Sequence, residues 1–538
     1  MTARHWPEPS GAELWAYVGA AASGERYGPA GTIAALASLA GAPRLGWVHP
    51  PSWPRVARLT AARGDGTLLR GCRQAVFVGT GGWAFGLRAI SEAVPGQRVI
   101  RVLDSLDPQA MQRTLRELRG CPATAWFAVS ASGRTRETRL LAATLAAARH
   151  RIGGAAPAWL CERAGTLSLA GGYDQVALYH APLSVPALLA ARILTPAHFD
   201  DAYRAFAGAA RAIGEWAGEE SARLPAVGRP RVLFRLPPGA GPGLRLWTLQ
   251  AARQGWGGKS ERFRPWPDVA CEQSEAALAQ AASAQSGAAS AQGGAASAQG
   301  GAASAQGGAV PCDGPAGRVA AAAAGPASGA LVVDVAAGIA ALPRPDGPAG
   351  AVAAAMAACY AVAALVACVA VRHGLRFATH DAVQHYKRLL PAAPTADDRP
   401  TGGRPVGSAD ELAAVLAGWL AERPDLGTVH VVGYGAEPVT ALGPEWLARR
   451  LGRPVEVHEG SGWNHHSYQL AWHTRSVGVA VLLTPDRPAD TGDRALDGAL
   501  AAQRHTLDAI AGATHRSLAP RSLLLRWHGG SGTPGRPR

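Results

Sequence analysis

In the first third of the chain, short apolar runs alternate with longer segments in which apolar positions follow a helical period. Each run is almost continuous, as in a strand that is covered on both faces. The runs lie at 75–78, 99–103, 125–129, 158–161 and 175–179. Helical segments at 107–118 and 138–149 separate some of them. This alternation predicts an α/β fold with a parallel, doubly wound sheet.

The same alternation returns in the last part of the chain. Residues 428–435 read as a strand that ends in a glycine turn, and 444–451 read as the helix after it. Two more strands are expected at 454–458 and 477–483. An alanine-rich stretch at 316–373, before these strands, is expected to be helical. The pattern therefore predicts a second α/β lobe.

A low-complexity segment separates the two regions. Residues 276–308 repeat Ala-Ala-Ser-Ala-Gln-Gly-Gly about every seven residues. A coiled coil would need large apolar side chains at this spacing, and the segment has none, so we interpret it as a flexible or disordered insert. The predicted organisation is a lead-in at 1–60, a first domain at 61–225, the start of a second lobe at 226–275, the insert at 276–310 and the rest of the second lobe at 311–530.

Residues 351–371 contain no charged side chain over 21 positions, which is long enough to span a bilayer. Most of these residues are alanine, which gains little on transfer from water, and no Trp/Tyr belt marks the ends. We therefore expect a buried helix rather than a membrane span. The N-terminal residues also lack an apolar run behind a basic region, so no signal peptide is expected.

Composition changes this picture only slightly. The net charge of +14 comes almost entirely from arginine, since Lys259 and Lys387 are the only lysines. The arginines are scattered and no aromatic residues are interleaved with them, so no nucleic-acid partner is predicted. The seven cysteines form no Cys-x-x-Cys pair and no zinc-like spacing, which argues against a metal site. They are typical of reduced thiols in a cytoplasmic protein.

Candidate chemistry begins at the segment Ser130–Thr138, which reads Ser-Ala-Ser-Gly-Arg-Thr-Arg-Glu-Thr directly after the third predicted strand. The hydroxyls of Ser130, Ser132 and Thr135 can converge with backbone N–H groups on one oxyanion, and the N-terminus of the next helix adds positive potential. The alternative is a Ser/Thr-rich helix cap with nothing bound. The segment alone does not decide between the two.

A glycine turn, Gly79-Thr-Gly-Gly82, follows the first predicted strand. Open α/β sheets bind their ligands at the carboxyl ends of such strands. Two glycine and hydroxyl turns at neighbouring strand ends therefore favour binding over a simple cap. We predict an oxyanion-binding crevice that includes Gly81 and Gly82 as well as the three hydroxyl residues.

These residues carry a resemblance. Ser-x-Ser-Gly-x-Thr-x-Glu-Thr is similar to the signature of sugar-phosphate isomerase (SIS) domains, and the Gly79–Gly82 turn resembles the first loop of that fold. The rest of the chain resembles the phosphoglucose isomerase family, most closely the isomerase part of fusions with transaldolase. The matching segments are Asp104–Pro108, Gly257–Lys259, Phe377–Lys387, Gly433–Gly435 and His466–Gln469. The resemblance implies an α/β protein with two doubly wound, three-layer lobes and a disordered insert.

The resemblance also implies an activity, the interconversion of glucose 6-phosphate and fructose 6-phosphate through an enediolate. His466 would open the sugar ring together with Lys387, and His465 is the alternative in the neighbouring register. No cofactor and no metal are expected, and the protein is expected to be cytoplasmic. A homodimer is implied because sites in this family are completed across subunits.

Two segments of the family pattern are missing. The Glu-Ser-x-Gly-Lys string that supplies the base is absent. Glu272 and Glu275 are the nearest carboxylates at the expected place, and Glu272 is the candidate. Glu459 is a second carboxylate that could orient His466 or join the site. The Gly-Gly-Arg segment that supplies an arginine is absent as well. A second hypothesis therefore stays open: a sugar-phosphate-binding sensor or partner subunit that keeps the Ser130 loop without the chemistry.

Overall fold

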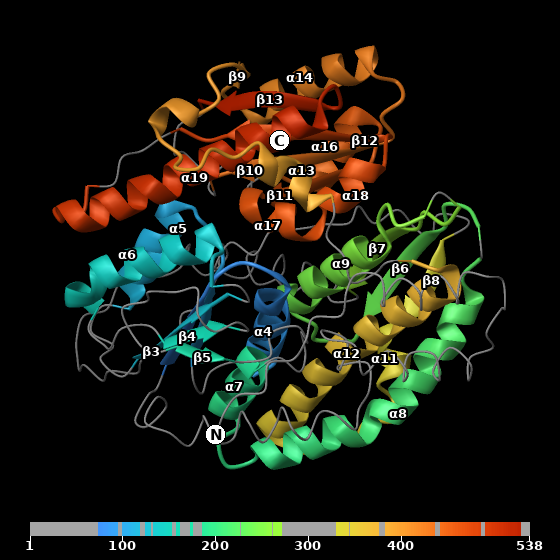
Figure 1. Ribbon diagram of the computed structural model, residues 1–538. Coiled ribbons are helices and arrows are strands. Elements are labelled where there is room, and N and C mark those ends of the chain that lie inside the picture. Colours follow the sequence, from blue (N-terminus) through green and yellow to red (C-terminus); the bar gives the residue numbers. More distant parts are fainter. Residues whose placement is uncertain are drawn as a thin grey trace, which may run out of the picture.

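The computed structural model supports a parallel α/β architecture with helices packed on its sheets (Figure 1). The predicted lead-in and the low-complexity insert lie outside the described residues. The residues that the structure describes are 74–94, 99–118, 124–130, 133–152, 158–161, 173–175, 185–225, 227–260, 262–271, 330–343, 345–375, 382–435, 442–485 and 490–528. The α/β class with parallel sheets, predicted from the alternating pattern, is confirmed.

The first sheet has the strand order β2-β1-β3-β4-β5, with every neighbouring pair parallel. Its strands are β1 (Gln74–Val78), β2 (Val99–Leu103), β3 (Thr124–Val129), β4 (Ala158–Cys161) and β5 (Tyr173–Gln175). The fifth strand begins two residues earlier than predicted. The helices that follow its strands are α4 (Gly82–Glu92), α5 (Pro108–Glu117) and α6 (Arg136–Ile152). Asp107 caps α5 by accepting from two backbone N–H groups, and Pro108 fits the first helical position.

The last sheet repeats this order. Its strands run β11-β10-β12-β13-β9, again all parallel, so that β10 to β13 correspond to β1 to β4. They are β9 (Arg404–Val406), β10 (Thr428–Tyr434), β11 (Val455–Glu459), β12 (Val477–Leu483) and β13 (Ser522–Trp527). Its helices are α14 (Ala409–Glu422), α16 (Pro444–Leu451), α17 (Gly460–His466), α18 (Tyr468–His473) and α19 (Arg494–Leu518).

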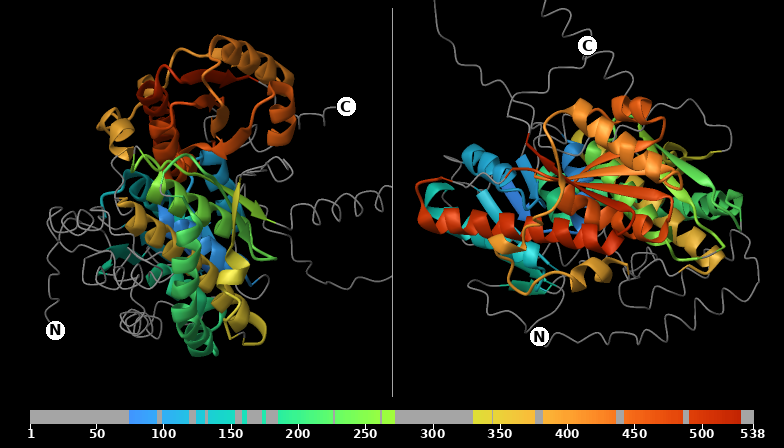
Figure 2. Two further views of the ribbon diagram at one scale, coloured as in Figure 1. Left: turned by 90° about the vertical axis from the view of Figure 1, so that its right-hand side faces the viewer. Right: turned by 90° about the horizontal axis from the view of Figure 1, so that it is seen from above.

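A third, smaller sheet lies between these two in the sequence, with the parallel order β7-β6-β8. Its strands are β6 (Arg231–Leu236), β7 (Trp266–Cys271) and β8 (Leu331–Asp334). The remaining helices are α7 (Val185–Leu194), α8 (Phe199–Arg223), α9 (Pro242–Trp256), α11 (Val335–Gly338), α12 (Gly347–His373), α13 (Val383–Arg388) and the 3₁₀ turn η4 (Ala396–Asp398). In Figures 1 and 2 the first and third sheets, with the helices packed on them, are neighbours. The last sheet lies on one side of both.

The alanine-rich helix α12 is the one helix in the described part of the chain that is long and apolar enough to cross a membrane. It packs against α8, α9 and α4, and 89% of its most apolar window is buried inside the protein. The small alanine side chains allow these helices to approach closely. The expected buried helix is thus present, and it forms the core between the first and third sheets.

Candidate functional site

The glycine turn after β1 brings the backbone close to the neighbouring elements. Gly79 and Gly81 have φ angles of +137° and +128°, which favour glycine. A Cβ atom on Gly79 would collide with the carbonyl oxygen of Val129, and one on Gly82 would lie 2.8 Å from Nε2 of Gln250. The hydroxyl of Thr80, inside this turn, is buried and has no hydrogen-bond partner within the described residues. An unsatisfied buried hydroxyl of this kind is rare and indicates a place for a ligand or water.

The Ser130 loop lies beside that turn, because β1 and β3 pair in register. Ser130 directly follows β3, and its hydroxyl donates to Oγ1 of Thr135 over 2.8 Å. Gly133, with a φ angle of +64°, closes the loop by donating its N–H to the carbonyl of Ser130 over 3.1 Å. The structure therefore brings Gly81, Gly82, Ser130 and Thr135 to one sheet edge, while Ser132 lies outside the described residues.

The second lobe contributes a carboxyl group to this edge. Ser105, just after β2, donates to Glu459, the last residue of β11. Burial raises the pKa of Glu459 to about 7, with help from the nearby carboxylates of Asp104 and Asp107 and against the guanidinium of Arg88. Oε1 of Glu459 is buried and has no hydrogen-bond partner in the described part of the chain. A carboxyl group with this pKa can take up or release a proton near neutral pH.

Helix α17 starts next to Glu459 and carries His465 to the same region. His465 is half-buried. Burial lowers its pKa, the Glu137 carboxylate opposes this, and the Lys387 ammonium adds to the lowering. These mutual influences place the imidazole near the start of α6 and near α13. The side-chain amide of Gln254, on α9, donates to the carbonyl of His465.

Lys387 is exposed on α13, and the segment after that helix is tied to the first lobe. Arg136, the first residue of α6, donates to the carbonyl oxygens of Pro391 and Ala392 over 2.8 and 2.6 Å. This contact holds the segment that bears Lys387 beside the helix that follows the Ser130 loop. A flexible ammonium at that position can reach an anion bound by the loop.

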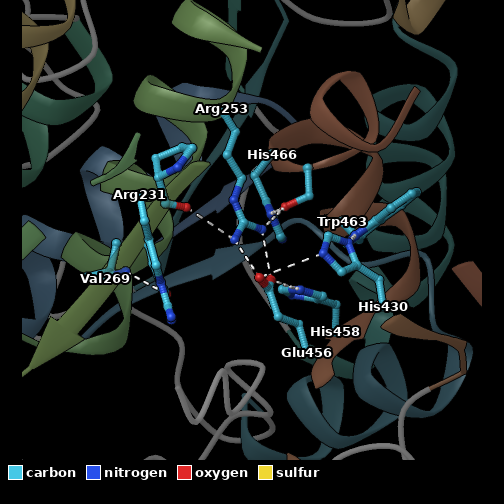
Figure 3. A network of polar contacts seen from close by, with 11 residues as sticks. Arg231, Arg253, Val269, His430, Glu456, His458, Trp463 and His466 are labelled. Atoms are coloured by element: carbon cyan, nitrogen blue, oxygen red, sulfur yellow. Dashed lines mark hydrogen bonds and ion pairs between the residues drawn. The ribbon is translucent and has the colours of Figure 1, made fainter. Parts of the chain in front are cut away.

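His466 faces the other way, into a buried polar network (Figure 3). It is 3% exposed, and its Nδ1 lies 2.7 Å from Oγ of Ser467. That hydroxyl also accepts from Nη1 of the fully buried Arg253 over 2.6 Å. Burial, above all, holds the pKa of His466 well below its usual range, so the ring is neutral. The structure thus places His465 and His466 in two different environments.

The network centres on the ion pair between Arg253 and Glu456. The guanidinium donates to both carboxylate oxygens, over 2.8 and 2.7 Å, and Nε2 of His458 lies 2.8 Å from Oε2. Burial alone would raise the pKa of Glu456, but Arg253 and the neighbouring histidines hold it well below its usual range. Helix α9, which follows β6 of the third sheet, carries Arg253, and β11 of the last sheet carries Glu456. This bidentate ion pair therefore connects α9 to the last sheet.

His430, Glu456 and His458 lie close enough to suggest a metal site. Their hydrogen bonds do not fit one. Trp463 donates its indole N–H to Nδ1 of His430 over 3.0 Å, and burial lowers the pKa of His430 to about 3. The neutral ring must therefore carry its proton on Nε2, the atom that faces Glu456, and it has no lone pair there for a metal. The positive charge of Arg253 already neutralises the carboxylate.

The candidate base Glu272 lies outside the described residues. Of the residues that reach the sheet edge, Gln250 and Gln254 were missed by sequence reasoning. They come from α9, which lies far from the motif in sequence, and no local pattern distinguishes them from other polar helix residues. Thr80 had a signal, because it lies between the glycines of the first turn.

Comparison with known proteins gives only distant similarities. No family model matches the chain, and no curated protein matches it either. A glucose-6-phosphate isomerase from Chlamydia trachomatis has 14% identity and a TM-score of 0.40, over 62% of this chain and 72% of that one. A hypothetical protein from Thermus thermophilus has 19% identity and a TM-score of 0.37, over 49% and 68%. The C-terminal domain of glucosamine-fructose-6-phosphate aminotransferase from Francisella tularensis has 10% identity and a TM-score of 0.34, over 61% and 95%.

Proposed function

We propose that this protein binds a sugar phosphate at the carboxyl edge of the first sheet and interconverts its aldose and ketose forms. One observation carries the proposal: a loop of hydroxyls and a protonatable carboxyl group, one of whose oxygens has no partner among the described residues, lie at the same sheet edge. The hydroxyls belong to Ser130 and Thr135, and the carboxyl group belongs to Glu459. The substrates we propose are glucose 6-phosphate and fructose 6-phosphate.

The phosphate group is assigned to the loop after β3. Ser130 and Thr135 can each turn a hydroxyl toward it, and the backbone around Gly133 adds N–H donors. The helix α6 begins directly after this loop, so its N-terminus favours a negative charge there. Lys387 can approach the same group from α13. Thr80, with its unpartnered hydroxyl, can bind a sugar hydroxyl or a phosphate oxygen.

Proton transfer is assigned to Glu459. An aldose–ketose isomerase moves a proton between two neighbouring carbons, and its base must be deprotonated before the reaction yet accept a proton during it. A carboxyl group with a pKa of about 7 meets both needs at neutral pH. We assign ring opening to His465, which faces the site, whereas the buried His466 positions Ser467 and α17. His466→Ala tests the assignment that the family resemblance implies.

The test combines turnover with binding. Conversion of fructose 6-phosphate to glucose 6-phosphate is measured for the wild type, Glu459→Gln, His465→Ala and His466→Ala, with the exposed Glu422→Gln as a matched control. We expect Glu459→Gln to lower kcat by about two to four orders of magnitude and to keep sugar-phosphate binding. Changing Ser130 and Thr135 to Ala together should weaken binding at least about tenfold, because hydrogen bonds to a charged group are lost.

Two outcomes would contradict the proposal in different ways. Binding that depends on Ser130 without any turnover would identify a sugar-phosphate-binding sensor or partner subunit. Absence of binding, or binding unaffected by the Ser130 and Thr135 changes, would reject the site itself.

A further inference from the structure

A cavity of about 180 Å³ lies where the C-terminal end of α9 meets the start of β7 and the loop after α18, and none of its lining residues belongs to the first-sheet edge. These three elements are labelled in Figure 1. Its lining residues include three arginines and one histidine. Arg229, Arg264, Arg475 and His473 contribute side chains, and Trp266 and Leu470 form an apolar part of the wall. No acidic residue lines it within the described part of the chain. Several positive groups around one small cavity are suited to an anion.

Two of the positive charges at this cavity are available for a ligand. Arg229 and Arg475 are exposed, and neither makes a hydrogen bond or ion pair with any described residue. Thr474 and Ser476, which flank Arg475, also line the cavity and add hydroxyl groups. An arginine fork and neighbouring hydroxyls together match the several acceptor oxygens of a phosphate group.

The walls of the cavity are held in place before any ligand arrives. Arg521 donates to the carbonyl oxygens of Ala471, Thr474 and Val477 over 2.9, 2.7 and 3.1 Å, which fixes the loop that carries Arg475. On the opposite side, Arg264 donates its backbone N–H to the carbonyl of Gly228 over 2.9 Å, which sets it beside Arg229. Rigid walls reduce the ordering cost of binding.

Glycine makes room at the third wall. Gly258 has a φ angle of +64°, and a Cβ atom there would collide with the ring of His473. Its neighbour Gly257 accepts a hydrogen bond from the side chain of Gln469 over 3.0 Å. The turn that follows α9 is therefore packed directly against the imidazole that faces the cavity.

We propose that this cavity is a second anion site, which binds the phosphate group of a small molecule independently of the first-sheet edge. At about 180 Å³ it is smaller than the roughly 300–1,000 Å³ of sites that enclose a whole drug-sized ligand. It therefore encloses inorganic phosphate, or the phosphate group of a larger ester whose remainder lies outside near Trp266.

Isothermal titration of the full chain with inorganic phosphate tests this proposal, with glucose 6-phosphate in a second arm to distinguish free phosphate from an ester. Arg475→Glu and Arg264→Gln should each weaken the affinity of the cavity for inorganic phosphate by about 10- to 100-fold. Arg211→Glu, a change of an exposed arginine on α8, should leave it unchanged. Thermal unfolding of every variant checks that it is folded.

The two sites are separated by the variant in which Ser130 and Thr135 are both Ala. Phosphate binding in the cavity should persist in that variant. It should be seen even if the first-sheet edge binds no sugar phosphate in the wild type or in any variant. The proposal is overturned if phosphate binds only at the first-sheet edge, or if binding is unchanged in both Arg475→Glu and Arg264→Gln.

Discussion

The first and last sheets share one strand order, yet their carboxyl ends differ in a way that separates binding from structure. Corresponding residues follow corresponding strands: Thr80 lies in the turn after β1, and Ser130 follows β3. In the last sheet Gly435 follows β10 and Thr484 follows β12. Open α/β sheets bind ligands at the carboxyl ends of their strands, so this edge of each of the two sheets is an expected position for a ligand.

Where β10 and β12 end, the edge of the last sheet is filled by the protein itself. Arg504, from α19, donates to the hydroxyl and the carbonyl of Thr484 over 3.0 and 2.7 Å. The same guanidinium pairs with Asp508 over 2.8 Å, and Arg399 donates to the carbonyl of Thr484 as well. A Cβ on Gly435 would collide with the Thr484 hydroxyl, so these two residues are in close contact.

The edge of the first sheet keeps polar atoms unsatisfied instead. The hydroxyl of Thr80 is buried and has no partner among the described residues. The same holds for one oxygen of Glu459, which reaches this edge from the end of β11 in the last sheet. Burying such atoms costs free energy unless a ligand or water satisfies them. The same strand order is therefore compatible with an edge filled by the protein's own side chains and with an edge that can bind a ligand. Unsatisfied buried polar groups distinguish the ligand-binding edge from the filled one.

The largest effect is expected where the last sheet is filled. Arg504→Met removes the nearest cation from the buried Asp508, which keeps only the longer contact with Arg399 at 3.8 Å among the ion pairs of the described residues. Breaking a buried ion pair by removing one side typically costs about 3–5 kcal/mol. Urea unfolding at pH 7 measures the change in the free energy of unfolding. Arg494→Met, on the exposed start of the same helix, should change it by less than about 0.5 kcal/mol. A loss below about 1 kcal/mol for Arg504→Met would show that this edge does not depend on its guanidinium.

The next effect has the opposite sign and lies at the first sheet. The pKa of Glu459 is raised from 4.5 to about 7 in the folded protein, so the native state binds the proton more tightly than the unfolded state. The contribution of Glu459 to the free energy of unfolding is therefore fully present below about pH 4.5, and it is lost as the pH rises to about 7. Glu459→Gln avoids that loss and should raise the free energy of unfolding at pH 8 by up to about 3 kcal/mol.

Unfolding curves at pH 8 and pH 4 check the sign, because the gain should vanish at pH 4. Glu422→Gln is the matched control and should show neither the gain nor its pH dependence. A variant Glu459→Gln that is less stable than the wild type at pH 8 would mean that the carboxylate is held by favourable contacts, as in the last sheet.

Local patterns predicted the parts of the site that are local. The strands β1 and β3 and the turns after them follow from apolar runs bounded by glycine and hydroxyl residues, so Gly81, Ser130 and Thr135 could be named from the sequence. The resemblance favoured His466 and left His465 as the alternative. Neighbouring residues on a helix point about 100° apart, and which of them faces the sheet edge depends on packing, which no local pattern contains. Gln250 and Gln254 reach the site only because α9 packs beside it. Helix α9 is far from the glycine turn and the Ser130 loop in sequence, so no local pattern predicts this contact.

The smallest effect tests the unsatisfied hydroxyl itself. Thr80→Val replaces it by a methyl group of similar shape, which removes a buried polar atom that has no partner in the described residues. The free energy of unfolding should rise by up to about 1 kcal/mol or stay unchanged, whereas Thr484→Val in the last sheet should lower it by about 1 kcal/mol or more because Arg504 and the Thr484 side chain lose their hydrogen bond. Sugar-phosphate binding should weaken in Thr80→Val alone. Equal losses of stability in the two variants would contradict the distinction between a binding edge and a filled one.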